Sequence, residues 1–594
     1  MIEYKCPKHK TPARLICIGK KKVYKCSEIE IDPITGKKID CDRDAVLSSS
    51  IYWCKKCNVP IFDKRCNCCN QEGTYIATDL RPVFPEEKLL LAVLLEKENV
   101  LEFEDKSVWN SSSGYIVDGE KLKISLKDIN SYELKRIKRI REIVDNNMDK
   151  IDYSLFDRII ERFVEANSPR FHDIETEAIG YIQKYEDKYN EDDMFVSFSG
   201  GKDSTVVSSL VEDAFPGKKI VRIFGDTTLE FPLTDVYRKR FAKEHRRVFN
   251  VVRAKNHEKN FENLCEQIGP PSRVMRWCCT VFKTGAITKT LESIFRDKTN
   301  ILSFQGIRKS ESVSRSKYER ESESPKITKQ TVALPILEWL DFDVWLYILT
   351  KKIDFNDAYR LGYSRVGCWC CPNNGSWSEF LSKVYMPDQY ENWRNLLIDF
   401  AKGINKEDAE DYIDGGFWKA RQGGNGLEAA QKSVVSFEPC ATEDNAFNYD
   451  LQKPISEELY ELFKPFGYIN TQLGNKRLGE VYVLDRKGDV VLVLQGRVGQ
   501  TKLKVTIKKT NIAGAKNLTT AEGKIQCQLT KYQMCLGCKA CESVCKHGAI
   551  TIREDCNGDI QYKIDDNKCV RCTECVGHFN AGCYMRKVLT IKRG

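Results

Sequence analysis

The sequence predicts an α/β chain, with a mostly parallel sheet between two cysteine-rich ends that bind metal. Three observations support this fold class. Apolar strands alternate with helical stretches over residues 191–430, an order typical of parallel sheets. The 594 residues include 26 cysteines, far more than packing alone requires. Many of these stand at regular short spacings before residue 75 and after residue 526, as metal ligands do.

Residues 1–75 are expected to form a zinc-binding region, with a zinc ribbon over residues 51–75. Two short turns of cysteines can reach one tetrahedral ion. The expected ligands are Cys54, Cys57, Cys66 and Cys69, with Cys68 as an alternative to Cys69. A looser group offers ligands for a second metal ion: Cys6, His9, Cys26 and Cys41.

Residues 76–130 alternate apolar and polar positions, which predicts a small β module. From Arg81 to about Ser125 this module resembles a PUA-like domain, which implies RNA binding. Residues 131–190 are polar and periodic, as in a helical linker. The basic runs Lys20–Lys25 and Lys135–Arg141 are either solvated faces or a surface for RNA or DNA.

The α/β region starts with a strand, a glycine turn and a helix, the geometry of a phosphate-binding loop. Glycines let backbone N–H groups approach phosphate oxygens, and the helix N-terminus adds partial positive charge. The spacing is not that of a Walker A loop. The expected nucleotide-binding residues are Ser199, Gly200, Gly201, Lys202, Asp203 and Ser204. Further strands are expected at Ile220–Phe224, Val248–Val252 and Asn300–Phe304.

The loop Ser199-Gly-Gly-Lys-Asp-Ser204 resembles the PP-loop of the ATP pyrophosphatase superfamily, whose members cleave ATP between the α and β phosphates. Three later motifs resemble the phosphoadenylyl-sulfate (PAPS) reductase family. They are Phe224-Gly-Asp-Thr-Thr-Leu-Glu-Phe-Pro, Gly306-Ile-Arg-Lys-Ser-Glu-Ser-Val-Ser-Arg315 and the stretch from Pro335 to Ile348. The resemblance covers about residues 190–375 and implies a PAPS reductase-like domain over residues 191–430.

This resemblance implies roles for four residues outside the loop. Arg308 and Arg315 would meet an anionic group, since guanidinium suits sulfate and phosphate. The alternative is a surface pair of arginines. Asp226 would lie at the nucleotide, and Lys283 near both substrate and cluster.

A pair of cysteines and a later Cys-x2-Cys turn resemble the iron–sulfur-dependent adenylyl-sulfate reductases. The match implies one [4Fe–4S] cluster on Cys278, Cys279, Cys368 and Cys371, with Cys370 as an extra thiol. Such a set also suits zinc.

The chain departs from this family in two ways. The Glu-Cys-Gly-(Leu/Ile)-His setting of the reductase nucleophile does not occur, and Cys440 is either a replacement nucleophile or a linker thiol. The full Ser-Gly-Gly-Lys-Asp-Ser loop is more similar to members that bind ATP.

Residues 431–525 are expected to form a linker and a β-rich region, and residues 526–594 a domain with two clusters. The run Cys535, Cys538, Cys541, Cys545 has the spacing of bacterial two-cluster ferredoxins. A second run is Cys569, Cys572, Cys575 and Cys583. This resemblance implies an α+β ferredoxin-like domain in which the last cysteine of each run serves the other cluster. Lys546 replaces the family's proline, and seven residues precede Cys583.

Composition narrows the class of protein. The longest apolar run, Leu89–Leu95, is too short to cross a bilayer, and no signal-peptide pattern opens the chain. We therefore expect a cytoplasmic protein with reduced thiols and no membrane partner. A net charge of +9 is compatible with nucleotide or nucleic acid.

Three functions fit these expectations. The first is an oxidoreductase of sulfur metabolism that reduces a sulfonucleotide with electrons from its own ferredoxin domain and an external donor. The second is an ATP-dependent sulfurtransferase that adenylates a nucleic acid, with Mg²⁺ as a further candidate ion. The third is a nucleic-acid-binding electron-transfer component without catalysis. The fused ferredoxin-like domain favours the first function over the other two.

Overall fold

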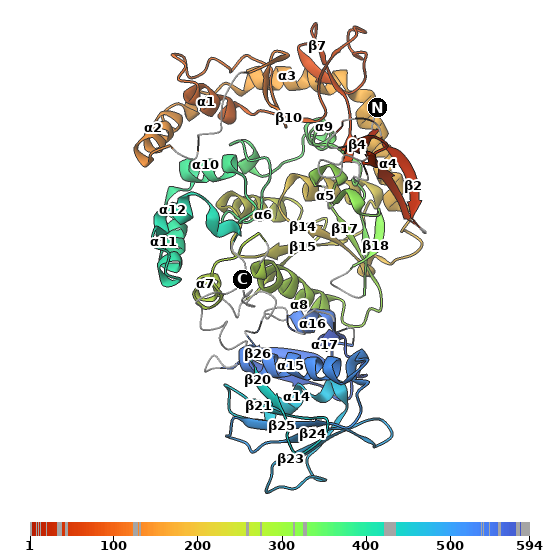
Figure 1. Cartoon of the computed structure of the whole chain (residues 1–594). Helices are drawn as coiled ribbons and strands as arrows, with labels where there is room; N and C mark the ends of the chain where they lie inside the picture. Colours follow the sequence, from red (N-terminus) through yellow and green to blue (C-terminus); the bar gives the residue numbers. More distant parts are fainter. Residues whose placement is uncertain are drawn as a thin grey trace.

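The computed structural model covers residues 1–594. It describes the chain except for residues 1–2, 7–8, 10, 12, 19–20, 32–37, 42–45, 123–128, 130–131, 257–259, 274–275, 313–314, 325–328, 421–434, 536, 538–539, 546, 556–559, 578–582 and 584–594. Figure 1 shows the N-terminal part above the central sheet and the C-terminal part below it. Within the described ranges, no helix has the length and apolar character needed to cross a membrane.

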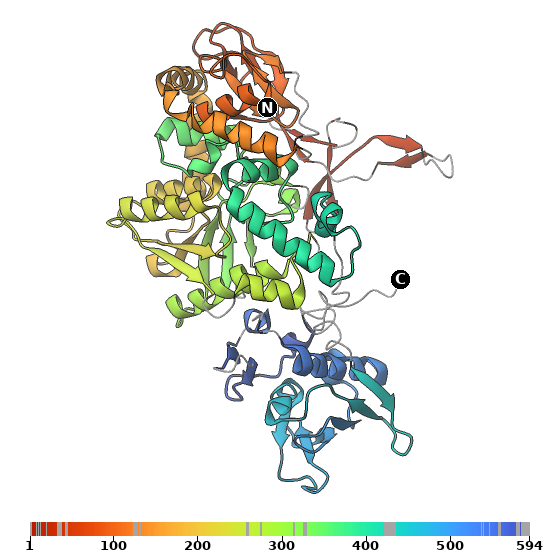
Figure 2. The same cartoon turned by 90° about the vertical axis from the view of Figure 1, so that its left-hand side faces the viewer.

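The described residues among the first 50 form three short antiparallel pairs of strands. The pairs are β1 (Glu3–Lys5) with β6 (Val46–Ser48), β2 (Arg14–Ile18) with β3 (Lys21–Lys25), and β4 (Ile29–Ile31) with β5 (Lys38–Asp40). Figure 2 shows N-terminal strands reaching away from the rest of the molecule. Pairs this short are marginal in water without further support.

Residues 51–121 form two small antiparallel sheets. The first has the order β8-β7-β9 and consists of β7 (Ile51–Cys54), β8 (Val59–Ile61) and β9 (Thr74–Ala77). The second consists of β10 (Leu80–Pro82), β11 (Val108–Ser111), β12 (Gly114–Val117) and β13 (Glu120–Lys121). The sequence indicated only β structure here, but the apolar run belongs to a nearly buried helix, α1 (Pro85–Leu94).

Helices cover residues 134–183, as the periodic pattern predicts. They are α2 (Leu134–Asp145), α3 (Tyr153–Ala166) and α4 (Ser168–Gln183), with the 3-10 turns η2 (Met148–Lys150) and η3 (Glu191–Asp193). In α2 the buried residues Ile137, Ile140 and Val144 follow helical spacing. One apolar core joins the strands β7 and β8 to α3, α4 and the central domain.

The central sheet has the order β16-β15-β14-β17-β19-β18, and only the edge strand β18 is antiparallel. Its strands are β14 (Met194–Phe198), β15 (Val221–Asp226), β16 (Val251–Lys255), β17 (Ile301–Gln305), β18 (Glu321–Glu323) and β19 (Gln330–Ala333). The predicted parallel sheet is therefore confirmed, with strand limits shifted by up to three residues.

Helices lie on both sides of this sheet (Figure 1). Those nearest the site are α5 (Lys202–Ala214), α6 (Pro232–Glu244), α7 (Phe261–Ile268), α8 (Gly285–Ile294) and α9 (Asp341–Lys351). Short turns are η4 (Cys279–Thr284), η5 (Lys309–Glu311), η6 (Arg315–Lys317), η7 (Asp357–Tyr359) and η8 (Phe417–Ala420). The domain continues with α10 (Ser376–Tyr385), α11 (Pro387–Gly403) and α12 (Ala409–Asp414).

The C-terminal part begins with an antiparallel sheet of order β20-β21-β25-β24-β23-β22. Its strands are β20 (Ser436–Pro439), β21 (Ala446–Asp450), β22 (Tyr468–Asn470), β23 (Glu480–Leu484), β24 (Val490–Gln495) and β25 (Lys502–Ile507). Between and after them lie α14 (Glu457–Glu461), η9 (Lys464–Phe466), η10 (Ile512–Gly514) and α15 (Leu518–Met534).

The chain then forms α16 (Ala540–Val544), an antiparallel hairpin of β26 (Ile550–Glu554) and β27 (Ile560–Ile564), and α17 (Glu574–Gly577). One apolar core contains residues of the six-stranded sheet, α15 and this hairpin. The β-rich region and the cysteine-rich end are thus packed together as one body.

Candidate functional site

The loop between β14 and α5 has the backbone of a phosphate-binding turn. Gly200 has φ +72°, a conformation that side chains rarely adopt. Ser204 Oγ donates to the Gly201 carbonyl at 2.8 Å and accepts the Ser199 N–H at 3.1 Å, so the loop closes on itself. Its N–H groups precede the first turn of α5, where the helix dipole favours an anion.

Two buried cations face this loop, and both are paired with carboxylates. Lys202 Nζ lies 3.1 Å from Asp203 and 3.1 Å from Asp341. Arg308 donates from Nε to Asp203 at 2.6 Å and from Nη2 to Asp341 at 2.7 Å. Burial disfavours the charges, but the two carboxylates raise the pKa of Lys202 and of Arg308 above the ordinary values. These predicted residues therefore meet in one charge network.

Gly306 explains how Arg308 reaches the loop. A Cβ on Gly306 would lie 2.6 Å from the backbone oxygen of Asp203, closer than real side chains approach. The missing side chain lets the end of β17 pack against the start of α5. The glycine of the Gly-x-Arg motif is thus required by close packing.

Besides Asp341, two residues of this network were not predicted as site residues. Asp79, in the turn between β9 and β10, accepts the N–H groups of Asp341 at 2.9 Å and Phe342 at 3.0 Å, and so caps α9. Desolvation and the neighbouring Asp341 raise the pKa of Asp79 to about 7. Tyr359 Oη accepts the N–H of Lys202 at 3.0 Å. Neither residue lies in a local motif that could have indicated its role.

Three other predicted residues lie apart from the Lys202 network. Arg315 pairs with Glu311 one turn before it, and burial lowers its pKa. Asp226, the last residue of β15, pairs with Arg253 and accepts the Thr228 N–H at 2.7 Å. Lys283 lies in η4, beside the end of the same strand.

The predicted thiol group of the central domain is assembled from two segments. Cys278 and Cys279 are at the start of the π-helical turn η4, and Cys368–Cys371 form a turn closed by an N–H···O bond of 3.2 Å. The loop after β15 supports that turn: Trp369 N–H donates to Leu229 at 2.9 Å, and Thr227 Oγ1 lies 3.3 Å from Cys368 Sγ.

These thiols are close enough to perturb one another. Contact with Cys279 and burial raise the pKa of Cys278 well above its ordinary value. Burial, Glu230 and the neighbouring Cys279 and Cys371 raise the pKa of Cys368 to about 12. A metal centre removes this penalty because it binds thiolates directly. Cys278, Cys279, Cys368 and Cys371 therefore lie near one another, as a bound cluster would require, and Cys370 lies buried beside them.

The front cysteines form a compact group. One ligand atom from each of Cys54, Cys57, Cys66 and Cys69 lies within 4.8 Å of the others. Cys54 Sγ is 3.4 Å from Cys69 Sγ, and Cys57 N–H donates to Cys54 Sγ at 3.4 Å. The alternative ligand Cys68 is exposed and outside this group. The set fits one tetrahedral ion.

The C-terminal cysteines form two neighbourhoods. One pocket is lined by Cys545 from the first run together with Cys569, Cys572 and Cys575 from the second. In the other neighbourhood, burial and nearby Cys583 and Cys541 raise the pKa of Cys535 to about 12. Cys538 lies outside the described residues. The last cysteine of each run thus lies with the other run.

The C-terminal part packs against the central thiol group. The helix α16, which carries Cys541, packs against η4 and α8. Met534 and Cys583 belong to the same apolar cluster as Trp277 and Cys370. Cys440 instead lies at the end of β20, in the six-stranded sheet, where Thr442 lowers its pKa.

Comparisons with known proteins identify the central domain. Residues 193–374 match the family model of the phosphoadenosine phosphosulfate reductase domain. The adenosine 5′-phosphosulfate reductase of Geobacillus sp. is 25% identical over 206 residues, which are 34% of this chain and 81% of that enzyme. The central part of the chain is therefore similar in sequence to this reductase family.

Two further comparisons are with an uncharacterized relative and with a solved structure. An uncharacterized protein of Methanocaldococcus jannaschii is 33% identical over 299 residues, which are 50% of this chain. The chain spans 60% of the length of that relative. The structure of PAPS reductase from Candida auris in a phosphate complex aligns with 32% of this chain and 94% of that one, at 15% identity and a TM-score of 0.25.

Proposed function

We propose that the chain is an iron–sulfur reductase of sulfonucleotides, with the electron supply built into its C-terminal part. The observation that carries this proposal is the packing of α16 and Cys583 against the segment that holds Cys278 and Cys279. The packing supports the proposal because the C-terminal cysteines would then supply electrons directly to a third group, within a domain similar to reductases of adenosine 5′-phosphosulfate.

The nucleotide would bind at the loop Ser199–Ser204. Its backbone N–H groups and the α5 dipole suit phosphate oxygens. Lys202 and Arg308 lie beside the loop but are neutralised by Asp203 and Asp341. An incoming anion would compete with these carboxylates for the two cations. Arg315 and Asp226, each with an ion-pair partner of its own, and Lys283 in η4 are further candidates for substrate contact, and a Mg²⁺ ion would accompany ATP.

Electrons would enter at the pocket of Cys545, Cys569, Cys572 and Cys575, where Cys572 is exposed to an external donor. They would continue through the group of Cys535, Cys538, Cys541 and Cys583, and then to Cys278, Cys279, Cys368 and Cys371. When bound, [4Fe–4S] clusters carry electrons one at a time. A zinc ion at Cys54, Cys57, Cys66 and Cys69 would have only a structural role.

The reaction balances with two electrons. The bond between sulfur and the bridging oxygen of the sulfonucleotide breaks, and that oxygen stays on the 5′-phosphate of the nucleotide, which leaves a monophosphate from adenosine 5′-phosphosulfate and a 3′,5′-bisphosphate from PAPS. Sulfur is reduced from the +VI to the +IV state and leaves as sulfite. The donor loses the same two electrons, so no other reactant is required.

The experiment is an anaerobic incubation with reduced methyl viologen and, in parallel, adenosine 5′-phosphosulfate, PAPS or ATP. We expect sulfite and the corresponding nucleotide phosphate from one sulfonucleotide, with two viologens oxidised per sulfite. Absence of sulfite from both sulfonucleotides would disprove the proposal. A Lys202→Ala variant is the matched control, because it removes a loop cation and leaves every cysteine.

A second function, ATP-dependent sulfur transfer to a nucleic acid, is favoured by the complete Ser-Gly-Gly-Lys-Asp-Ser loop. The incubation with ATP, repeated with RNA or DNA present, tests it, since adenylation of a nucleic acid releases pyrophosphate from ATP. A non-catalytic electron-transfer component would release neither product, and its nucleic-acid binding would persist in the Lys202→Ala variant.

A further inference from the structure

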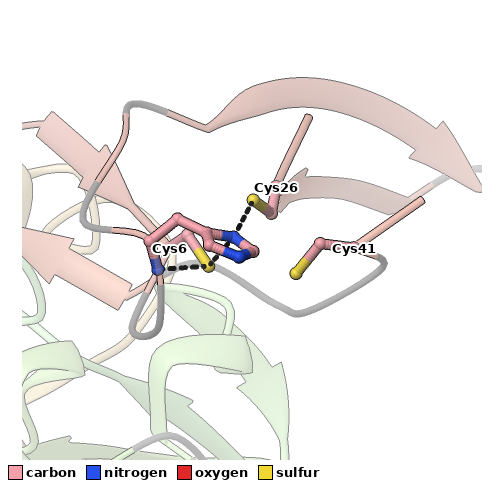
Figure 3. A group of neighbouring side chains, drawn as sticks. Cys6, Cys26 and Cys41 are labelled. Carbon is pink, nitrogen blue, oxygen red and sulfur yellow. Dashed lines mark hydrogen bonds between the residues drawn. The ribbon is translucent and has the colours of Figure 1, made fainter. Parts of the chain in front are cut away.

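Residues near the N-terminus bring four metal-ligating side chains together. One ligand atom from each of Cys6, His9, Cys26 and Cys41 lies within 4.8 Å of the other three. His9 Nδ1 is 3.6 Å from Cys6 Sγ and 3.4 Å from Cys26 Sγ. Figure 3 shows the side chains of Cys6, Cys26 and Cys41 gathered together from separate parts of the chain.

These cysteines are almost inaccessible, although they are in a segment of short strands. Cys6 is 0%, Cys26 2% and Cys41 3% exposed. Among the described residues they form a buried cluster whose only members are these three cysteines. Ordinary buried cysteines pack among aliphatic and aromatic side chains, and within the described part of the chain no such side chain belongs to this cluster.

The backbone around the sulfurs suits thiolates. The His9 N–H donates to Cys6 Sγ at 3.4 Å, and the Glu28 N–H donates to Cys26 Sγ at 3.4 Å. Hydrogen bonds of this kind stabilise the charged form of sulfur. Three thiolates with one imidazole are a closed tetrahedral set, which is typical of structural zinc.

We propose that Cys6, His9, Cys26 and Cys41 bind a structural zinc ion, separate from the ion expected at Cys54–Cys69. The ligands lie in or beside three different strand pairs of residues 1–50. An ion shared by these segments supplies the stability that strands of three to five residues lack.

The position of this site links it to the charge network. Tyr4, two residues before Cys6, accepts a hydrogen bond from Lys309 Nζ at 2.9 Å. Lys309 also pairs with Glu338 at 3.0 Å, and Tyr4 Oη lies 3.4 Å from the same carboxylate. Strand β6 packs against η5, the turn that follows Arg308. The zinc ion therefore fixes a segment that supports the Arg308 turn from outside.

The first test is the metal content of the anaerobically purified full-length protein, measured by inductively coupled plasma mass spectrometry. We expect two zinc ions per chain. X-ray absorption at the zinc edge of the same sample requires no variant, and we expect seven sulfurs and one nitrogen per two zinc ions. A single zinc ion with four sulfur ligands would overturn the proposal, as would iron in place of the second zinc.

Variants then locate the second ion. Cys41→Ala and His9→Ala should each lose one zinc per chain, whereas His9→Cys should retain both because four thiolates also hold zinc. The matched control is Cys68→Ala, which removes an exposed cysteine outside both groups. Two zinc ions in Cys41→Ala would overturn the assignment. Zinc content does not depend on the proposed reductase activity, so the two proposals fail separately.

Discussion

Arg308 Nε donates to Asp203 Oδ1 at 2.6 Å, and this ion pair joins the turn after β17 to the phosphate-type loop. Arg308 is 4% exposed. The residues expected to attract an anion are therefore held in place by carboxylates. Substrate binding would exchange one set of charge-assisted contacts for another.

Replacement of Arg308 by alanine should be strongly destabilising. Breaking a buried ion pair by removal of one partner costs about 3–5 kcal/mol, because the remaining charge stays desolvated. Thermal unfolding of the anaerobic protein measures the change. The control is Lys502→Ala, which removes an exposed pair with Asp450 and should cost less than about 1 kcal/mol. Equal decreases in unfolding temperature in both variants would contradict a buried charge network around Arg308.

Gly306→Ala should distort the same region by steric contact alone. The added Cβ would lie 2.6 Å from the backbone of Asp203, and overpacking of this kind costs about 1–3 kcal/mol. Gly180→Ala in α4 is the matched control, since nothing lies within 4 Å of its added Cβ. That change should stabilise the helix by about 0.5–1 kcal/mol. Unfolding temperatures that move in the same direction would refute the packing argument.

Asp79 should make stability depend on pH. Its pKa is raised from 3.8 to about 7, so the native protein keeps a proton that the unfolded chain loses between these values. The stability contributed by this group is fully present below its unfolded pKa and is lost as pH rises toward about 7. We expect the unfolding temperature of wild type, relative to that of Asp79→Asn, to be lower at about pH 8 than at about pH 5.

The control for this pH series is Asp187→Asn, which changes an exposed carboxylate. The difference in unfolding temperature between Asp187→Asn and wild type should be the same at both pH values. A pH-independent difference for Asp79→Asn would mean that the carboxylate is ionised throughout the range.

Because the last cysteine of each C-terminal run lies with the other run, we can predict which cysteine variants lose the same cluster. Cys545→Ala and Cys572→Ala should each remove the same cluster, whereas Cys583→Ala should remove the other. Each variant should lose about four iron atoms per chain. Electron paramagnetic resonance of the reduced proteins distinguishes the two centres. Identical spectra for Cys545→Ala and Cys541→Ala would contradict the crossing.

The sequence predicted the local parts of this molecule well. The parallel strands and the turn at Ser199–Ser204 follow from apolar runs and glycines that are adjacent in the chain. Gly306 and Arg308 were found through a motif. The helix α1 was missed because its apolar run in a β-rich stretch has no helical periodicity to identify it.

What the sequence could not predict depends on distant contacts. Asp79 and Asp341 are 262 residues apart, and no periodicity or motif relates them. The contact of Tyr359 with Lys202 is of the same kind. The packing of α16 against η4 likewise could not be predicted, because the spacing within a cysteine run does not indicate which other segment of the chain lies beside that run.

The docking of Tyr4 on Lys309 and Glu338 also bears on the order of events during synthesis. Tyr4 and Glu338 are separated by 334 positions in the chain. At typical elongation rates the ribosome needs roughly 20–60 s to make that length. The N-terminal segment therefore leaves the ribosome long before its docking surface exists. Early binding of the zinc ion would keep the newly synthesised N-terminal segment compact and protect its thiols from oxidation during this interval.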